Sequence, residues 1–162
     1  MSTLYDYEVS TVGAERHWSI PYSRLEDATP EVGHAAMLLS AVEGTQVGGI
    51  VLALDAANSK AVIDFTPGKI YGLNVRNVIT YAGAAEATFR AINIGDPVYY
   101  DESATMPAGV ELSPSPLDAA GNANAVFGYV VPKGETDSAL YPKGTTTAST
   151  QACGVMARGA GA

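Results

Sequence analysis

Apolar and polar residues alternate in short runs over most of the chain, a pattern typical of half-buried β-strands. The clearest run is Ile70–Tyr81. Its Leu73 and Val75 fall on one face of the expected strand, and Asn74 falls on the other. The same pattern predicts further strands over Val47–Leu54, Ala61–Phe65, Ala85–Ile92, Pro97–Tyr100, Val110–Leu112, Ala125–Val131 and Ala152–Ala157.

Polar and glycine-containing segments between these runs predict tight turns. Asp55–Lys60 separates two of the strands and predicts a β-hairpin. Ile94–Pro97, with the sequence Ile-Gly-Asp-Pro, predicts a turn immediately before another strand. Short strands at this spacing, punctuated by Gly and Pro, indicate an all-β fold with a small β-barrel or sandwich core.

One segment, from Thr29 to Gly44, favours a short helix. Thr29 suits the N-cap, Pro30 the first helical position and Gly44 the stop. Four apolar residues would then share one helical face: Met37, Leu38, Ala41 and Val42. We therefore expect an N-terminal arm with a short helix over residues 1–44, followed by a β-barrel domain over residues 45–162.

Two long irregular stretches interrupt the expected barrel, at residues 101–124 and 132–150. The first contains Met106–Gly109, and the second contains the run Thr145–Thr150. Loops of more than about 12–15 residues in a compact domain are usually functional or disordered. Either stretch is therefore a candidate contact loop, with a solvated linker as the plain alternative for the Thr-rich run.

The first 23 residues are rich in aromatic side chains, namely Tyr5, Tyr7, Trp18 and Tyr22. Disordered segments are poor in aromatics, and the alternation here indicates short strands or an extended arm. Two interpretations stay open. The four residues belong to the first strands of the fold, or they anchor the chain on a partner protein by burying large side chains during strand addition.

Charge and composition narrow the class of partner. The chain has 9 basic and 17 acidic residues and a net charge of −8, so nucleic acid and an anionic membrane surface are not expected partners. Charged residues make up 16% of the chain, against about 25% in ordinary soluble domains. This composition favours a protein that covers much of its surface with other protein.

Targeting signals are not evident in the sequence. The N-terminus lacks the basic and apolar regions of a signal peptide. The longest uninterrupted apolar run, Gly48–Leu54, is far shorter than the roughly 20 residues that span a bilayer. We therefore expect a protein that is made in a cytoplasm and is kept or assembled there.

Catalytic motifs are missing from the sequence: it has no phosphate-binding loop, no Gly-x-Gly-x-x-Gly, no Gly-x-Ser-x-Gly and no His-x-x-x-His pair. Cys153 is the only cysteine, so it can form no intramolecular disulfide. It could form a nucleophile–base pair with His17 or His34, the only imidazoles, but a small buried hydrophobe is the favoured interpretation. We expect no enzymatic activity and no cofactor.

A cluster of carboxylates lies near the Ile94–Pro97 turn. Asp96, Asp101 and Glu102 supply the oxygen ligands that Ca²⁺ takes in proteins. The favoured alternative is that Asp96 stabilises the turn and that the other two are solvated. We therefore expect no metal site.

Three segments of the C-terminal part carry a resemblance to a known family. They are Ala91–Asp101, with its Gly-Asp-Pro-Val-Tyr-Tyr-Asp sequence, Phe127–Val131 and Ala152–Ala160. In their order and glycine placement they resemble the head-decoration, or capsid cement, proteins of tailed bacteriophages.

The resemblance implies a β-barrel protein that binds the outside of the expanded capsid, typically as a homotrimer at three-fold and quasi-three-fold positions. Its partner would be the major capsid protein, and its role would be to clamp neighbouring capsid subunits against internal DNA pressure. The aromatic residues of the arm would then be the expected capsid or subunit contacts.

Two other functions fit the same composition. The first is a tail, baseplate or fibre component of a virion. The second is a carbohydrate-binding β module, in which an exposed Trp18 and the tyrosines stack on sugar rings.

Overall fold

Nearly all of the regular secondary structure in the described residues is β-strand, accompanied by two short 3-10 helices, Tyr22–Arg24 and Ala56–Asn58. The structure, a computed structural model, describes residues 15–41, 44, 46–79, 88–101, 106–132, 140–141 and 147–160. The all-β class predicted from the sequence is confirmed. The strands are β1 His17–Pro21, β2 Ala35–Met37, β3 Gly48–Asp55, β4 Lys60–Asp64, β5 Ile70–Arg76, β6 Val78–Ile79, β7 Thr88–Phe89, β8 Ile92–Asn93, β9 Pro97–Tyr100, β10 Leu112–Ser113, β11 Val126–Val131, β12 Leu140–Tyr141 and β13 Thr150–Ala157.

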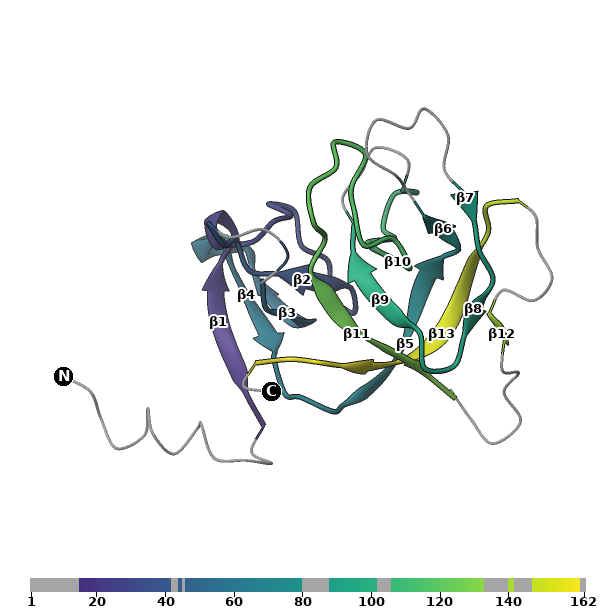
Figure 1. The fold of residues 1–162 in the computed structure, drawn as a ribbon. Helices are drawn as coiled ribbons and strands as arrows, with labels where there is room; N and C mark the ends of the chain where they lie inside the picture. Colours follow the sequence, from purple (N-terminus) through teal and green to yellow (C-terminus); the bar gives the residue numbers. More distant parts are fainter. Residues whose placement is uncertain are drawn as a thin grey trace.

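The strands form two main bodies that lie side by side (Figure 1). One is a four-stranded sheet in the order β1-β4-β3-β2, and the other is a closed barrel in the order β10-β5-β13-β11-β9. Two short pairs, β12 with β8 and β6 with β7, accompany the barrel. The C-terminal end of β13 runs back from the barrel towards the sheet, so the last described residues connect the two bodies.

Local sequence explains the turns. In the β3–β4 hairpin the Asp55 side chain accepts a hydrogen bond from the Asn58 N–H, and Ser59 adopts a left-handed conformation with φ 51°. Between β8 and β9 the Asp96 carboxylate accepts a hydrogen bond from the Asn93 N–H at 2.9 Å. Both turns predicted from the sequence are therefore confirmed.

The helix predicted from Thr29 to Gly44 is wrong, because residues Ala35–Met37 form strand β2. All three residues of β2 are buried, since Ala35 and Met37 pack into the barrel core and Ala36 packs into a second core on the opposite face of the sheet. A strand that is buried on both faces shows no polar alternation, and its sequence therefore cannot be told from that of a buried helix.

The two cores divide the molecule differently from the expected boundary at residue 44. The four-stranded sheet takes strands from both sides of that residue, and the chain passes from the sheet into the barrel between β4 and β5. One face of the sheet closes the barrel core. Its other face builds the second core around Val51, Ile63 and Phe65, which the C-terminal Ala160 joins.

Candidate functional site

The outer face of the barrel carries a row of apolar side chains across four neighbouring strands. The register pairs Pro97 of β9 with Tyr129 of β11, Tyr129 with Met156 of β13, and Met156 with Ile70 of β5. Ile70 is 58% exposed and Tyr129 41%, whereas Pro97 and Met156 are partly buried. We call these four residues the barrel row.

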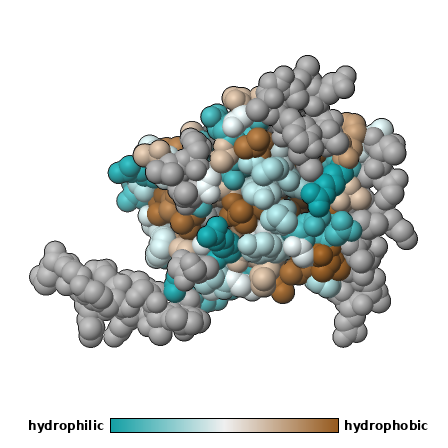
Figure 2. Space-filling view, in the orientation of Figure 1, coloured by the Kyte–Doolittle hydropathy of each residue, from teal (hydrophilic) through white to brown (hydrophobic). Residues whose placement is uncertain are grey.

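Neighbouring positions widen the barrel row into a surface. Ile94, 37% exposed, lies in the β8–β9 turn, which is joined to β11 by a hydrogen bond from the Gly95 N–H to the Val130 carbonyl. Val131 is partly exposed and pairs with Gly154, which has no side chain to interrupt the surface. Figure 2 shows brown, apolar residues gathered at the lower right of the molecule, where β9 and β11 meet in Figure 1.

A charged pair borders the barrel row at its β9 end. Asp96 precedes Pro97 and lies 3.5 Å from the Arg90 guanidinium. An apolar centre with a charged border is the composition of protein–protein interfaces. Contiguous exposed apolar surface on a soluble domain commonly marks such a contact.

Sequence reasoning missed the barrel row because of a β-bulge. Phe127 is almost fully buried and Tyr129 is exposed, although strict alternation puts residues two apart on the same face. The register of β11 against β9 shifts between Val126 and Gly128, so one extra residue reverses the faces beyond it. The signal that could have revealed the barrel row in the sequence is Gly128, because a glycine inside an otherwise apolar strand often marks a bulge.

Two of the four expected contact residues lie in the described part of the chain, one in β1 and one in the 3-10 helix Tyr22–Arg24 that follows it. Trp18 of β1 packs against Phe65, with ring centroids 4.9 Å apart, and Tyr22 packs against the same second core. Both are partly buried. Tyr5 and Tyr7 lie outside the described residues. Trp18 is therefore a packed residue of the sheet that stays partly exposed.

A polar network joins the sheet to the barrel at Asp64. This carboxylate, at the end of β4, is 2% exposed and accepts hydrogen bonds from the Lys69 ammonium at 2.8 Å and the Tyr71 hydroxyl at 2.6 Å. The Thr66 N–H donates to its other oxygen at 2.9 Å. Lys69 also contacts the Glu15 carboxylate at 2.9 Å, which fixes the chain just before β1.

The network shifts the pKa of each of its main members. Burial alone would raise the pKa of Asp64, but the hydrogen bonds from Lys69, Thr66 and Tyr71 outweigh it and hold the pKa well below the ordinary value. The hydrogen bond to Asp64 raises the pKa of Lys69. Burial, followed by the hydrogen bond to Asp64, raises the pKa of Tyr71. At neutral pH the cluster is therefore an ionised carboxylate held by an ammonium and a neutral phenol.

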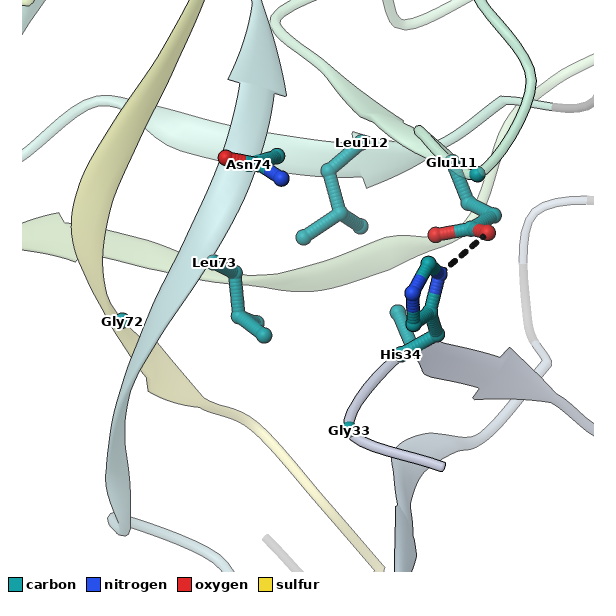
Figure 3. Close-up of a pocket in the computed structure, with 9 residues that line it drawn as sticks. Gly33, His34, Gly72, Leu73, Asn74, Glu111 and Leu112 are labelled. Carbon is teal, nitrogen blue, oxygen red and sulfur yellow. Dashed lines mark hydrogen bonds and ion pairs between the residues drawn. The ribbon is translucent and has the colours of Figure 1, made fainter. Parts of the chain in front are cut away.

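A small pocket between sheet and barrel contains the second polar pair, His34 and Glu111 (Figure 3). His34 precedes β2 and Glu111 precedes β10, so the pair bridges the two bodies, with Nδ1 3.2 Å from Oε1. Glu31 lies 3.5 Å from the other ring nitrogen. Gly109 packs so closely over the imidazole that a Cβ there would lie 3.1 Å from the ring.

Burial destabilises the ionised form of Glu111 in this pair. Its pKa is raised, because burial opposes ionisation more than the hydrogen bond from His34 favours it. A raised carboxyl pKa means that the folded state binds the proton more tightly than the unfolded chain. The resulting stability is therefore present at low pH and is lost as the pH rises through the pKa of the folded state.

Replacing Glu111 with glutamine tests this assignment. Glutamine keeps an oxygen acceptor for His34 but has no charge to bury, so the variant should gain stability relative to the native chain as the pH rises from about 4 to 7. The measurement is urea denaturation of both proteins across that range. Parallel stability curves for Glu111→Gln and the native chain would contradict the burial argument.

The two described carboxylates near the β8–β9 turn, Asp96 and Asp101, have different hydrogen-bond partners. Asp96 stabilises the turn by accepting the hydrogen bond from the Asn93 N–H, as we expected in the favoured alternative. Asp101 is buried, not solvated as expected, and it accepts a hydrogen bond from the Ser113 hydroxyl at 3.2 Å. Glu102 lies outside the described residues. Across the described part of the chain, no group of three or more histidine, cysteine or acidic side chains could hold a metal ion.

The cysteine and the histidines occupy different environments. Cys153 is fully buried within the barrel core, as expected for a small hydrophobe. His17 lies 3.7 Å from Asp64, and His34 lies against Glu111 in the pocket. The contacts of the two imidazoles are therefore with carboxylates.

No protein-family model matches the chain, and comparisons with curated proteins and with solved structures find no match. Among the residues that the structure describes, no helix is long and apolar enough to cross a membrane.

Proposed function

We propose that this protein is a capsid decoration protein of a tailed bacteriophage. It binds the outer surface of the mature shell and clamps neighbouring major capsid subunits against internal DNA pressure. The observation that carries the proposal is the barrel row, because three of its four residues lie in the segments in which the sequence resembles this family.

The three resembling segments are far apart in sequence but adjacent in the fold. Ala91–Asp101 contains β9, Phe127–Val131 lies in β11, and Ala152–Ala160 contains most of β13. These strands are consecutive neighbours in the barrel, in the order β13-β11-β9. The resembling segments therefore form one continuous part of the barrel. Three of the four residues of the barrel row belong to it.

A clamping role requires a contact surface and does not require a reactive centre. Exposed apolar side chains release water when they are covered, at about 25 cal/mol for each Å² of apolar surface buried. Each copy then needs only a modest contact, because a trimer that holds several subunits gains strength by avidity. The low charge density of the chain suits a surface that is covered by other protein.

The test is binding to expanded, undecorated phage shells, with occupancy imaged by cryo-electron microscopy. The native protein should add ordered density at three-fold positions. Ile70→Glu places a charge in the barrel row and should weaken shell binding at least about fivefold, the effect of losing a residue worth more than about 1 kcal/mol in an interface. The side chain of Ile70 is 58% exposed, so the variant should fold normally.

Val32→Glu is the matched control, because Val32 is 56% exposed and lies in the turn before β2, outside the barrel strands. It should bind shells like the native chain. Equal binding by both variants would remove the barrel row as the contact. Bare shells with the native protein, in matched capsids, would overturn the proposed function and favour the tail, baseplate or fibre alternative.

A further inference from the structure

Strand β1 has an open edge. It lies at the end of the order β1-β4-β3-β2, on the side of the sheet that faces away from the barrel, and within the described residues only β4 pairs with it (Figure 1). The Arg16 carbonyl accepts from the Phe65 N–H, so Arg16 points its backbone groups at β4. These groups alternate in direction along an antiparallel strand. Those of His17, Ser19 and Pro21 therefore point away from β4.

The opposite end of the sheet is covered by neighbouring chain. Beyond β2 the Glu26 N–H donates to the Met37 carbonyl, and the Leu39 N–H donates to the Arg24 carbonyl, both at 2.9 Å. Of the two terminal strands, β1 alone is open along its length in the described part of the chain. A two-fold contact suits one open edge, because it uses the same edge of both copies and leaves neither free to bind a third.

We propose that two copies of this chain pair antiparallel through β1, about a two-fold axis at Ser19, and so join their sheets into one. In this register His17 lies opposite Pro21 of the second copy, and Ser19 lies opposite its own counterpart. The His17 N–H then donates to the Pro21 carbonyl, and the Ser19 N–H to the Ser19 carbonyl, in both directions across the axis.

The bounds of the strand fix this register. Pro21 is the last residue of β1, where a proline is tolerated, and the pairing needs only its carbonyl. The His17 carbonyl, which faces the proline nitrogen, is left to solvent. A shift by two residues in one direction would set Ile20 opposite Arg16, and in the other it would run the pairing into the 3-10 helix Tyr22–Arg24.

The same register continues an apolar row of the sheet. Leu54, Ala61 and Ile20 are successive register partners, as are Trp18 and Ile63. Ile20 would lie opposite Trp18 of the second copy, an aromatic–β-branched pair of the kind that stabilises antiparallel strands. Both side chains are only partly buried in the single chain, whereas Ala61 and Ile63 are fully buried. A slip by one residue would set Trp18 and Ile20 against the polar face instead.

On the other face, one end of the contact carries a cation. Lys60 begins β4, is exposed and is the register partner of Pro21. Its partner in β3 is Asp55, whose carboxylate accepts hydrogen bonds from the backbone N–H and the side-chain amide of Asn58 in the hairpin turn. Within the described part of the chain Lys60 has no ion pair.

The other end of β1 carries an excess of carboxylates on this face. Glu15 and Asp64 share the Lys69 ammonium, at 2.9 and 2.8 Å, and both lie against His17. With a neutral His17 this end is therefore negative. The antiparallel arrangement brings Lys60 of each copy beside this acidic end of the other, so the two copies attract each other at both ends of the contact.

The contact is small. An edge of five residues buries less than the roughly 1,600 Å² of a standard stable interface, so we expect a weak dimer that responds to dilution. The pairing uses no residue of the barrel row and does not depend on the proposed binding to shells. Its tests are made without capsids, and either proposal can fail while the other stands.

Dilution tests the pairing. Between about 1 mM and about 10 μM protein, the mass found by sedimentation should fall, and the His17 and Ser19 amides should exchange at least about fivefold faster. The Trp18 and Ile20 amides point at β4 and should stay protected at both concentrations, which shows that the sheet is folded. Exchange of His17 and Ser19 that does not change with concentration would overturn the proposal.

Two substitutions at the axis test the hydrogen bonding. Ser19→Pro removes an N–H that points away from β4, so the variant should fold normally but lose the concentration dependence. Ser19→Ala keeps the N–H and should pair like the native chain. Trp18 is the only tryptophan, so its emission should shift to shorter wavelength with rising concentration in the native chain and in Ser19→Ala, but not in Ser19→Pro. Equal pairing by the two variants would contradict the contact.

A disulfide tests the position of the axis. The Cα atoms of a directly hydrogen-bonded antiparallel pair lie about 5.5 Å apart, within the range that a disulfide spans. Ser19→Cys should therefore form a covalent dimer under mild oxidation. Ala56→Cys, which is also exposed but lies in the hairpin turn, should not, and the native Cys153 is buried. Equal cross-linking of the two variants would contradict an axis at Ser19.

Discussion

Replacing Gly128 with alanine should destabilise the protein by about 3 kcal/mol or more, the range of a severe backbone or core defect. Gly128 lies at the bulge of β11, where the strand passes directly against β13. A Cβ at this position would overlap the Met156 carbonyl oxygen and press on the Ala157 Cα. Both are backbone atoms of β13, so no side-chain rotation can make room.

The measurement is the free energy of unfolding from urea denaturation, with Gly95→Asn as the control. Gly95 lies in the β8–β9 turn with φ +95°, and no atom lies within 4 Å of a Cβ built there. Asparagine tolerates positive φ better than most residues, so the control should lose only about 1 kcal/mol. Equal unfolding free energies for Gly128→Ala and the native chain would show that β11 and β13 are not packed as described.

Replacing Asp64 with alanine should lower the free energy of unfolding by about 3 kcal/mol at neutral pH, the cost of breaking a buried charged pair. Three donors lose their acceptor at once, namely the Lys69 ammonium, the Tyr71 hydroxyl and the Thr66 N–H. Lys69 and Tyr71 lie in or beside β5, so the loss falls on the junction between sheet and barrel.

The same network predicts the response to acid. Because the pKa of Asp64 is lowered in the folded state, its contribution is fully present above the ordinary carboxyl pKa of 3.8 and is lost as the pH falls below it. The difference in unfolding free energy between Asp64→Ala and the native chain should therefore be constant from about pH 5 to 7 and shrink below about pH 4.

Asp55→Ala is the control for both measurements. Asp55 is exposed and holds only the turn of the β3–β4 hairpin, so its loss should cost about 1 kcal/mol, the usual effect of removing a cap. A loss for Asp64→Ala no larger than that for Asp55→Ala would show that the junction does not rest on the Asp64 network.

The sequence predicted the positions of most strands because those positions depend on neighbouring residues. Pro97–Tyr100 is a strand with the expected bounds, and Ile70–Arg76 shows the expected alternation, with Leu73 and Val75 buried and Asn74 exposed. The two turns followed from Asp55 and Asp96, whose carboxylates hold nearby N–H groups. Signals of this kind are complete within a few residues of the chain.

Trp18 and Tyr22 show how far the site could be predicted. Their aromatic character marked them as important, but sequence alone left two interpretations open, as strand residues or as anchors on a partner. The sequence does not reveal which residues these side chains contact, because Phe65, against which Trp18 packs, follows β4 and is far from Trp18 in the chain. The barrel row was missed altogether, since each of its residues comes from a different strand.

The sequence by itself determined the all-β class, most strand positions and the two turns, since alternation and turn chemistry are local. Tertiary structure decided that Ala35–Met37 is a strand buried on both faces, that the bulge at Gly128 turns Tyr129 outward, and that β13 lies between β5 and β11. The physical reason is that burial, register and strand order depend on which distant segments come into contact. Those contacts place Asp64 among its donors and assemble the barrel row.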